Sequence, residues 1–316
     1  MRIVFMGSPE FAVPTLDALV ESRAEVPLVV TQPDRRAGRG RQLEETAVKS
    51  AARGHGLPVV EWGARDAARV TQLVRDAAPD AVVVTAFGHI LRQPLLDAPR
   101  LGCLNLHASL LPRWRGVAPV HYAIMHGDAW SGVSIMRMDA GVDTGPVLAQ
   151  RAVAIEPEET AGDLLDRLAG LGADLMVRTL RTLESGAAQQ MQLAGTPQNE
   201  TGAVYAPKLN RSLSPLRWER SAVKVHNQVR GLQPWPGATT YLDDRQIKIT
   251  GARPWSFHTS GDEPGTVLAV VDEGLCVACG EGVLLVTGLQ NTGKKPMTAA
   301  EFLRGCPIPV GARLRS

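Results

Sequence analysis

The sequence predicts an α/β protein: a Rossmann-like, doubly wound and mostly parallel sheet, followed by a small β-barrel domain. Three observations support this prediction. Helical and strand patterns alternate across residues 1–189, regular signals fade across residues 190–206, and short strands separated by turns fill residues 207–316. A chain of 316 residues also exceeds the usual size of one hydrophobic core. We therefore predict a first domain, a linker and a second domain over these three ranges.

The first domain opens with a strand, a turn and a helix, as in a nucleotide-binding βαβ unit. Residues 3–6 are apolar, and Pro9 suits the first turn of a helix. The helix is expected to run to about Arg23 and to break at Pro14. Gly7 stands nearly alone, so the glycine-rich fingerprint of dinucleotide binding is missing, which disfavours a dinucleotide oxidoreductase.

The remaining elements follow in order. Residues 81–87 are apolar throughout, as expected for a central parallel strand covered on both faces. Further strands of the first domain are expected at 27–31, 57–61, 134–138 and 147–155, and helices at 44–53, 64–78, 118–126 and about 160–186. In the second domain a helix at 222–231 precedes strands at 239–242, 246–250, 265–271, 275–278 and 283–290. Such short, evenly spaced strands are typical of a small β-barrel.

Composition indicates a cytoplasmic globular protein. Hydrophobic residues make up 44% of the chain and charged residues 21%, and the apolar run at the amino terminus is too short for a secretory signal or a membrane span. The cysteines, Cys103, Cys276, Cys279 and Cys306, are too few to staple a fold of this size. Cys276 and Cys279 have metal-like spacing but no matching second pair, so we interpret them as small strand residues and expect no metal.

Basic charge is unevenly distributed, although the net charge is only +2. A glycine-containing loop carries Arg35, Arg36, Arg39 and Arg41. Such a loop is either a solvated surface or a phosphate-backbone binder, because guanidinium groups bind phosphate bidentately. The second domain carries a further basic group, interleaved with tryptophans: Lys208, Arg211, Arg217, Arg220, Lys224, Arg230, Arg245, Lys248 and Arg253, with Trp218, Trp235 and Trp255. This pattern suits a nucleic-acid surface, although a place in the core is favoured for any one tryptophan.

Two polar side chains at the end of a buried strand form the candidate catalytic pair. Asn105 and His107 are two residues apart, so an extended chain projects them from the same face. Open α/β sheets bind their ligands at such strand ends. An amide that donates to an oxygen and an imidazole that carries a proton suit attack of an amine on a carbonyl-type carbon. A later strand and turn carry Asp139 and Asp143, and either carboxylate can orient the histidine.

Two nearby residues allow alternative interpretations. Arg115 either meets a substrate anion or pairs with a local carboxylate. His89 follows the apolar strand at its carboxyl end, so it either lines the site or packs in a loop, and packing is favoured.

Several motifs resemble those of the folate-dependent formyltransferases. They are Asn105-Leu106-His107, Ser109-Leu110-Leu111-Pro112, Arg115-Gly116 and Asp143-Thr144-Gly145-Pro146. The resemblance extends from residues 1–7 through 32–41 to 227–238 and covers nearly the whole chain. Within that family, the chain is similar to the members that formylate initiator tRNA.

The resemblance implies transfer of a formyl group from 10-formyltetrahydrofolate to the α-amino group of methionyl initiator tRNA, in support of translation initiation. It implies an OB-like second domain that helps to hold tRNA, and it favours Asp143 over Asp139. The implied site residues are Asn105, His107 and Asp143 for catalysis, Ser109, Leu110, Leu111 and Pro112 for the folate, and Arg35, Arg36, Arg39 and Arg41 for tRNA. The expected partners are initiator methionyl-tRNA and the folate cosubstrate, with no membrane, and we expect the protein to act as a monomer.

Two other functions stay open. The first is formyl transfer to a small amine, such as a sugar nucleotide or glycinamide ribonucleotide. The arginine loop and the basic second domain argue against it, because a small acceptor needs neither. The second is a catalytically silent RNA-binding protein, which the intact Asn105, His107 and Asp143 and the segment 109–112 disfavour.

Overall fold

The computed structural model describes residues 1–37, 42–185, 195–256 and 261–316. These residues form two compact units. The first unit contains Met1–Pro119, Ser131–Val153 and Leu165–Ala206, and the second contains Val120–Trp130, Ala154–Leu164 and Pro207–Ser316. Two segments from the predicted first domain thus group with the second unit. The predicted domain limits at residues 189, 190, 206 and 207 stay a prediction.

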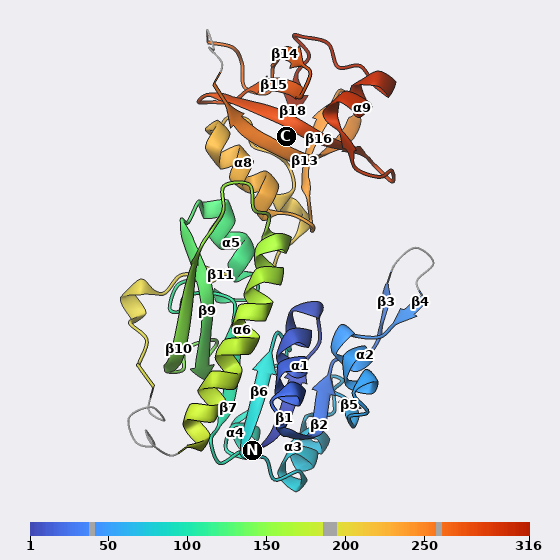
Figure 1. The fold of residues 1–316 in the computed structure, drawn as a ribbon. Helices are drawn as coiled ribbons and strands as arrows, with labels where there is room; N and C mark the ends of the chain where they lie inside the picture. Colours follow the sequence, from blue (N-terminus) through green and yellow to red (C-terminus); the bar gives the residue numbers. More distant parts are fainter. Residues whose placement is uncertain (38–41, 186–194, 257–260) are drawn as a thin grey trace. The chain divides into compact units, whose positions relative to one another are not determined.

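The first unit is built on a seven-stranded sheet (Figure 1). In sheet order the strands are β10 (Val147–Ala154), β9 (Trp130–Arg137), β7 (Cys103–His107), β6 (Ala81–Thr85), β1 (Arg2–Gly7), β2 (Glu25–Thr31) and β5 (Val59–Glu61). The strands from β7 to β5 pair in parallel, whereas β9 pairs antiparallel with β7. This mostly parallel sheet confirms the predicted Rossmann-like fold class.

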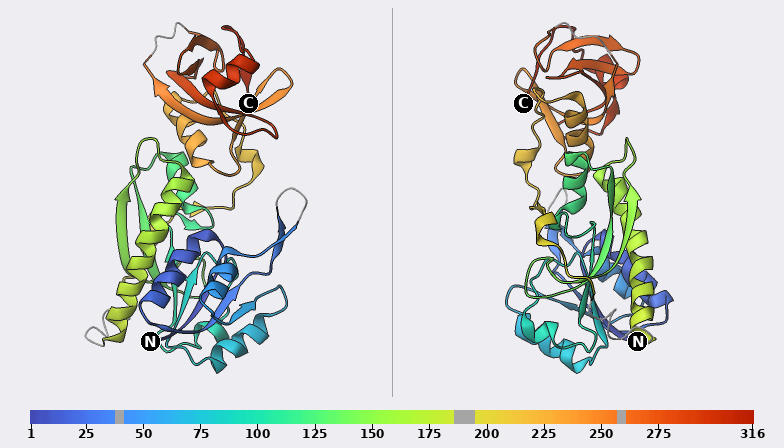
Figure 2. Two further views of the ribbon diagram at one scale, coloured as in Figure 1. Left: turned by 45° about the vertical axis from the view of Figure 1, so that its right-hand side comes forward. Right: turned by 90° about the vertical axis from the view of Figure 1, so that its left-hand side faces the viewer.

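Helices cover both faces of this sheet, with α1 and α6 on one face and α3 on the other (Figure 2). The helical segments of this part of the chain are η1 (Glu10–Ala12), α1 (Val13–Glu21), α2 (Ala47–Gly54), α3 (Ala67–Asp76), α4 (Gln93–Leu96), α6 (Ala161–Glu184) and η2 (Glu200–Gly202). A further helix, α5 (Pro119–His126), groups almost entirely with the second unit. The helical stretch is divided close to the expected break at Pro14: η1 ends at Ala12 and α1 begins at Val13. Pro14 lies in the first turn of α1, where its missing N–H leaves no hydrogen bond unmade.

Two short strand pairs complete the first unit. β3 (Arg35–Ala37) and β4 (Gln42–Glu44) pair antiparallel and form a hairpin. The sequence predicted a loop in this part of the chain. We call the pair of strands the arginine hairpin. β8 (Arg115–Gly116) pairs in parallel with β11 (Tyr205–Ala206), which comes from the segment predicted to be a linker.

The second unit is an antiparallel sheet that closes upon itself. Its strands follow the order β14 (Val267–Val271), β15 (Gly274–Ala278), β16 (Val283–Asn291), β13 (Arg245–Trp255), β12 (Ala238–Leu242) and β18 (Leu314–Arg315), with β17 (Met297–Thr298) paired to β16. Its helices are η3 (Arg211–Leu213), α8 (Ala222–Gly231) and α9 (Ala299–Gly305).

Backbone hydrogen bonds between the two ends of this sheet close it. The Val267 N–H donates to the Ala312 carbonyl at 2.9 Å, and the Leu314 N–H donates to the Gly265 carbonyl at 2.8 Å. Gly265 has a φ of +89°, and a Cβ there would lie 2.1 Å from the Leu314 carbonyl oxygen, so the close approach requires glycine. We call this junction the barrel seam. It confirms the prediction of a small β-barrel after the α/β sheet.

Each unit has its own hydrophobic core. One cluster packs the strands of the first sheet against α3 and α4, and another fills the barrel around Trp218, Leu284 and Phe302. The four cysteines are free and buried, and burial raises the pKa of Cys103 and of Cys279 to about 12. Cys276 lies in β15, as expected for a small strand residue, whereas Cys279 follows directly after the strand.

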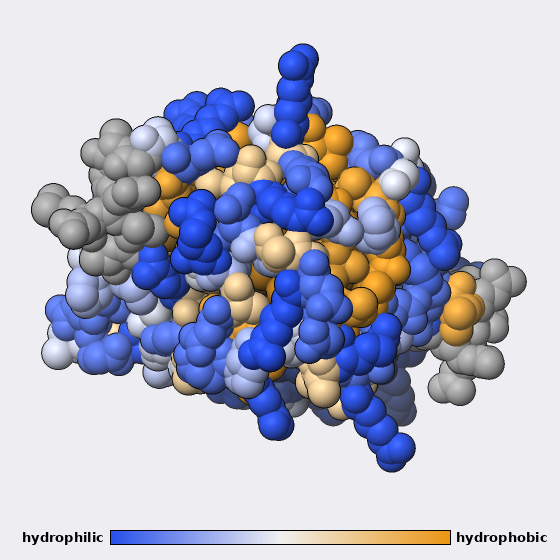
Figure 3. All heavy atoms as spheres, turned by 90° about the horizontal axis from the view of Figure 1, so that it is seen from below, coloured by the Kyte–Doolittle hydropathy of each residue, from blue (hydrophilic) through white to orange (hydrophobic). Residues whose placement is uncertain are grey.

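The face seen from below the view of Figure 1 is mostly hydrophilic, and its apolar side chains gather around the middle of this face (Figure 3). Across the described parts of the chain, none of the helices combines the length and the apolar character that crossing a membrane requires.

Candidate active site

Asn105 and His107 lie on one face at the carboxyl end of β7. The side chain between them, Leu106, points the other way: a Cβ on Gly172 of α6 would lie 2.6 Å from it, so α6 packs directly over β7. Because side chains alternate along a strand, Asn105 and His107 project from the face opposite α6. Both are nearly buried, with exposed fractions of 9% and 6%. The strand therefore fixes the two side chains with little rotational freedom.

His107 is held through both ring nitrogens. Its Nε2 lies 2.9 Å from the Trp114 carbonyl oxygen, and its Nδ1 lies 3.6 Å from Oδ2 of Asp143. A carbonyl only accepts hydrogen bonds, so Nε2 carries a hydrogen. The proton that the ring gains and loses is consequently the one on Nδ1, on the side that faces Asp143. Trp114 itself has a φ of +62°, a conformation rare for a large residue.

Asp143 is the carboxylate that meets the pair. Its Oδ1 lies 3.5 Å from Nδ2 of Asn105, and its Oδ2 accepts a 2.8 Å hydrogen bond from the Gly116 N–H. Asp139 is exposed and accepts hydrogen bonds from Gly141 N and Thr144 Oγ1 within its own loop. The structure thus brings Asn105, His107 and Asp143 together, and it leaves Asp139 in a local turn.

The segment from Ser109 to Pro112 continues directly from this strand. Ser109 and Leu111 are buried, whereas Leu110 and Pro112 are half-buried. The side chain of Ser134 accepts from the Leu111 N–H at 3.1 Å and donates to the Ser109 carbonyl at 2.6 Å, and Gln150 donates to the Leu111 carbonyl at 3.0 Å. Several backbone groups suggested as ligand contacts are therefore used within the protein, and the folate contact stays a prediction.

Arg115 is fully buried and pairs with a carboxylate of the same chain. Its guanidinium forms a two-pronged contact with Glu200, with distances of 2.9 Å and 2.8 Å. The hydrogen bond to Glu200 is the main cause of the raised pKa of Arg115. Of the two interpretations of Arg115, local pairing is the one that the structure shows.

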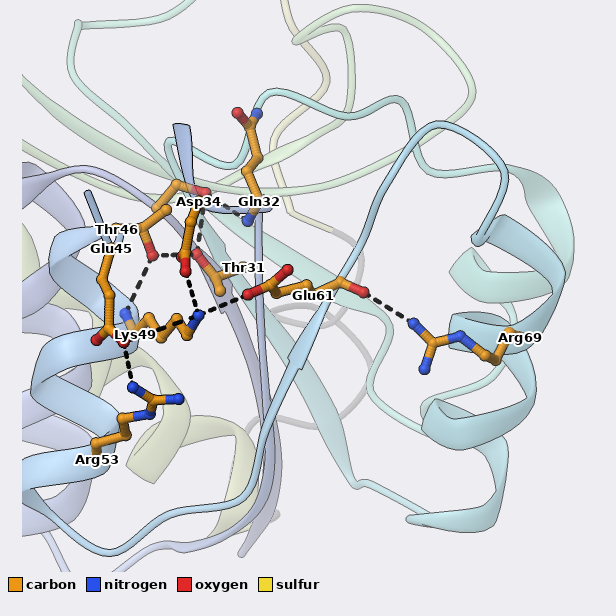
Figure 4. A network of polar contacts seen from close by, with 10 residues as sticks. Thr31, Gln32, Asp34, Glu45, Thr46, Lys49, Arg53, Glu61 and Arg69 are labelled. Atoms are coloured by element: carbon orange, nitrogen blue, oxygen red, sulfur yellow. Dashed lines mark hydrogen bonds and ion pairs between the residues drawn. The ribbon is translucent and has the colours of Figure 1, made fainter. Parts of the chain in front are cut away.

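The arginine hairpin is anchored at its base by a buried lysine. Arg35 and the backbone of Arg36 lie in β3, whereas Arg39 and Arg41 lie outside the described residues. At the base, Nζ of Lys49 lies 2.6 Å from Asp34 and 2.6 Å from Glu61 (Figure 4). The hydrogen bond to Asp34 is the main cause of the raised pKa of Lys49. We call these three side chains the anchor cluster.

Other residues singled out in the sequence have structural contacts. His89 stacks on Trp62 with ring centroids 5.2 Å apart, and burial lowers its pKa, so packing is what the structure shows. Arg230 is buried and donates to Asn227 and to the carbonyls of Glu156 and Glu159, which removes it from the exposed basic group.

Within the described ranges, no three His, Cys, Asp or Glu side chains are grouped as metal ligands would be.

The tryptophans of the second unit divide between core and surface. Trp218 is buried and donates from Nε1 to Thr240, as the core interpretation predicted. Trp235 is 48% exposed. The guanidinium of Arg253 lies 4.5 Å from the ring centre of Trp255.

Comparison with known proteins agrees with this fold. The family described as "Formyl transferase" matches residues 1–180, and the one described as "Formyl transferase, C-terminal domain" matches residues 208–307. Both halves are those of a formyl transferase.

Individual relatives narrow this class. The methionyl-tRNA formyltransferase of Gluconobacter oxydans (strain 621H) is 47% identical over 323 residues, which cover 99% of this chain and 100% of the relative. The enzyme of the same name from Aromatoleum aromaticum is 44% identical, with coverage of 100% and 98%. The chain belongs to the methionyl-tRNA formyltransferase family. Among solved structures, the sugar 3N-formyl transferase WlaRD is similar in fold, with a TM-score of 0.67 at 16% identity over 93% of this chain and 99% of that one.

Proposed function

We propose that this chain transfers the formyl group of 10-formyltetrahydrofolate to the α-amino group of methionyl initiator tRNA, and that Asn105, His107 and Asp143 carry the reaction. The observation that supports these roles is the meeting of an amide, an imidazole and a carboxylate at the end of β7. Family membership supports the acceptor, because relatives that match over nearly their full length bear that name.

Each residue has a distinct task in this reaction. The α-amino group has an ordinary pKa near 8, so a useful fraction is already a free nucleophile. Asn105 donates to the formyl oxygen as the new C–N bond forms and negative charge develops. A donor of this kind lowers a barrier by about 2.7–4 kcal/mol, or 10²–10³ in rate.

His107 and Asp143 handle the proton. Nδ1 of His107 accepts the proton that the attacking amine loses and returns it to the folate nitrogen as the old C–N bond breaks. The carboxylate of Asp143, 3.6 Å away, stabilises the ring while it holds that proton. No proton is gained or lost overall, and no oxidant or reductant is needed.

We assign substrate binding to the flanking segments. The folate lies against Ser109, Leu110, Leu111 and Pro112, where the half-buried Leu110 side chain and the second lone pairs of the carbonyls can serve it. The arginine hairpin, with Arg35, Arg36, Arg39 and Arg41, meets tRNA phosphates. In the second unit, Lys208, Arg211 and Arg217 are exposed, and Arg253 lies over Trp255, which suits a nucleic-acid backbone with its bases.

One chain carries all these residues, so we expect the protein to act as a monomer. Because translation is initiated in the cytoplasm, we expect the protein to act there.

The test measures the acceptor directly. The purified full-length protein is given 10-formyltetrahydrofolate with a labelled formyl group and, in separate reactions, charged initiator methionyl-tRNA, a nucleotide-linked amino sugar, or glycinamide ribonucleotide. We expect transfer to the tRNA alone. Transfer to a small amine and not to tRNA would overturn the acceptor, and failure on all three would favour a silent RNA-binding protein.

The variant Asn105→Ala tests the proposed role of the amide in the same assay. Because the amide is needed as the intermediate forms, kcat should fall about 10²–10³-fold while the KM for each substrate changes little. The measurement is steady-state formylation with each substrate varied in turn. A variant with unchanged kcat would remove Asn105 from the proposed chemistry.

A further inference from the structure

Residues 198–200, near the carboxyl end of the first unit, contact the candidate active site of that unit. Its Gln198 accepts from Nε and Nη2 of Arg115 through Oε1, at 3.0 Å and 2.9 Å. Two residues further on, Glu200 pairs with the same guanidinium. Arg115 is fully buried, and every polar contact it makes is a donation, so it fixes both acceptors. This segment therefore contains a rigid polar contact where the sequence indicated a linker.

The other end of the Gln198 amide holds the loop of Asp143. Nε2 of Gln198 donates to the carbonyl oxygens of Asp143 and Gly145, at 2.8 Å and 2.7 Å. The direction of the amide follows from chemistry: a guanidinium only donates and a carbonyl only accepts, so the oxygen must face Arg115 and the NH₂ must face the loop. A single side chain thus bridges a buried cation and the two ends of a catalytic turn.

This turn needs external support. Asp143 has a φ of +55°, which a residue with a Cβ adopts at a cost unless its surroundings hold it. Its carboxylate is held separately, by the N–H of Gly116, which follows Arg115 in the chain. Gly116 is itself fixed: its φ is +109°, and a Cβ there would lie 2.7 Å from the Ala206 carbonyl oxygen, so only glycine fits beside β11.

We propose that Gln198 is a positioning residue for formyl transfer. It holds the backbone of residues 143–145, so that the Asp143 carboxylate stays within reach of Nδ1 of His107 and Nδ2 of Asn105. Arg115 and Glu200 set the direction of the Gln198 amide. This inference rests on the proposed catalytic role of Asp143.

The primary test compares Gln198→Ala with a neighbouring control. Asn199 is exposed, and its side chain accepts only from Thr201 in the contacts described, so Asn199→Ala should leave formylation unchanged. In Gln198→Ala, the kcat for formylation of initiator methionyl-tRNA should fall about 10- to 100-fold, while the KM values for tRNA and folate stay within about twofold. A matching loss in kcat for both variants, or unchanged kcat in Gln198→Ala, would overturn the proposal.

A second variant guards against a general folding defect. Gln198→Glu keeps an acceptor for Arg115 but places an oxygen against the two loop carbonyls. We expect a folded protein, judged by circular dichroism and a thermal midpoint near that of Gln198→Ala or above it, with kcat reduced as in Gln198→Ala. Full activity of Gln198→Glu would show that the two donated hydrogen bonds do not matter.

A double-mutant cycle separates positioning from simple stabilisation. If Gln198 acts through Asp143, Gln198→Ala should reduce kcat no further in an Asp143→Asn background. Full additivity of the two losses would overturn the positioning role. If Asp143→Asn alone leaves kcat unchanged, the proposed role of Asp143 fails instead, so the two failures are distinguishable.

Discussion

At the residue scale, the site depends on how three polar groups share a single carboxylate. Asp143 accepts from the Gly116 N–H and lies 3.5 Å from the Asn105 amide and 3.6 Å from His107. One carboxylate thus lies against both the Asn105 amide, the proposed oxygen donor, and the His107 ring, the proposed proton carrier. The nearby Asp139 has the same functional group but uses it to close its own turn.

This difference leads to a prediction for the two aspartates. Asp143→Asn removes the charge that stabilises the protonated ring of His107, so kcat should fall by about 10²-fold or more. Asp139→Asn should leave kcat near that of the unchanged protein, because an asparagine oxygen still accepts from Gly141 and Thr144. Steady-state formylation of initiator methionyl-tRNA by the two variants measures both effects. Equal losses would contradict the separation of roles.

The sequence predicted these residues unevenly, for physical reasons. The period of an extended strand is enough to place Asn105 and His107 on one face. Spacing alone could not choose between Asp139 and Asp143, because both lie in a glycine-rich turn whose path depends on distant contacts. Gln198 gave no signal at all, since its partners lie 53 and 83 residues away in the chain. Long-range polar contacts of this kind leave no periodic pattern.

At the element scale, strands and helices of regular length were predictable, and the shortest elements were not. The apolar run at residues 81–87 corresponds to β6, and the expected helix at 222–231 is α8. Strands of two residues, such as β8 and β11, are too short to show alternation, and their pairing depends on the fold. The hairpin of β3 and β4 was expected to be a loop because its composition is rich in glycine and arginine, whereas its base is set by the anchor cluster.

The anchor cluster carries a prediction about stability. Lys49→Met keeps the side-chain volume but leaves Asp34 and Glu61 without their shared cation, so the free energy of unfolding should fall by about 2–3 kcal/mol. Arg53→Met, which removes only an exposed ion pair with Glu45, should cost less than about 1 kcal/mol. Urea unfolding at neutral pH measures both. A Lys49→Met protein as stable as Arg53→Met would show that the cluster does not support the hairpin base.

At the scale of the whole molecule, the order of the two fold types followed from the sequence, but the composition of the units did not. Residues 120–130 and 154–164 group with the second unit. The contacts responsible are specific: Arg230 donates to the Glu156 and Glu159 carbonyls, and the Gly162 N–H donates to the Gln233 carbonyl. Such bonds join segments some 70 residues apart, and sequence periodicity reports only on local structure.

His121 of α5 gives this second unit a predictable response to acid. Burial lowers the pKa of His121 to about 4, from an ordinary 6.5. Between these two values the unfolded chain binds a proton that the folded protein does not, so the free energy of unfolding falls as the pH falls. Allowing for the partial exposure of the ring, the loss at pH 5 should be about 1–2 kcal/mol.

Urea unfolding of the unchanged protein and of His121→Gln at pH 7 and pH 5 measures this response. The carboxylates are common to both proteins, so their contribution cancels in the difference. The unchanged protein should lose about 1–2 kcal/mol more than the variant over this interval. Identical losses would show that His121 titrates normally in the folded protein.

The barrel seam affects the tendency of the protein to self-associate at high protein concentration. An open β-sheet presents a row of unpaired N–H and C=O groups at each border, and such a row is a template for a strand from another molecule. Here the hydrogen bonds among Gly265, Val267, Ala312 and Leu314 occupy those groups where the two borders meet. The seam therefore protects against intermolecular strand pairing. Local opening there would favour self-association, while Asn105, His107 and Asp143 of the first unit keep their own contacts.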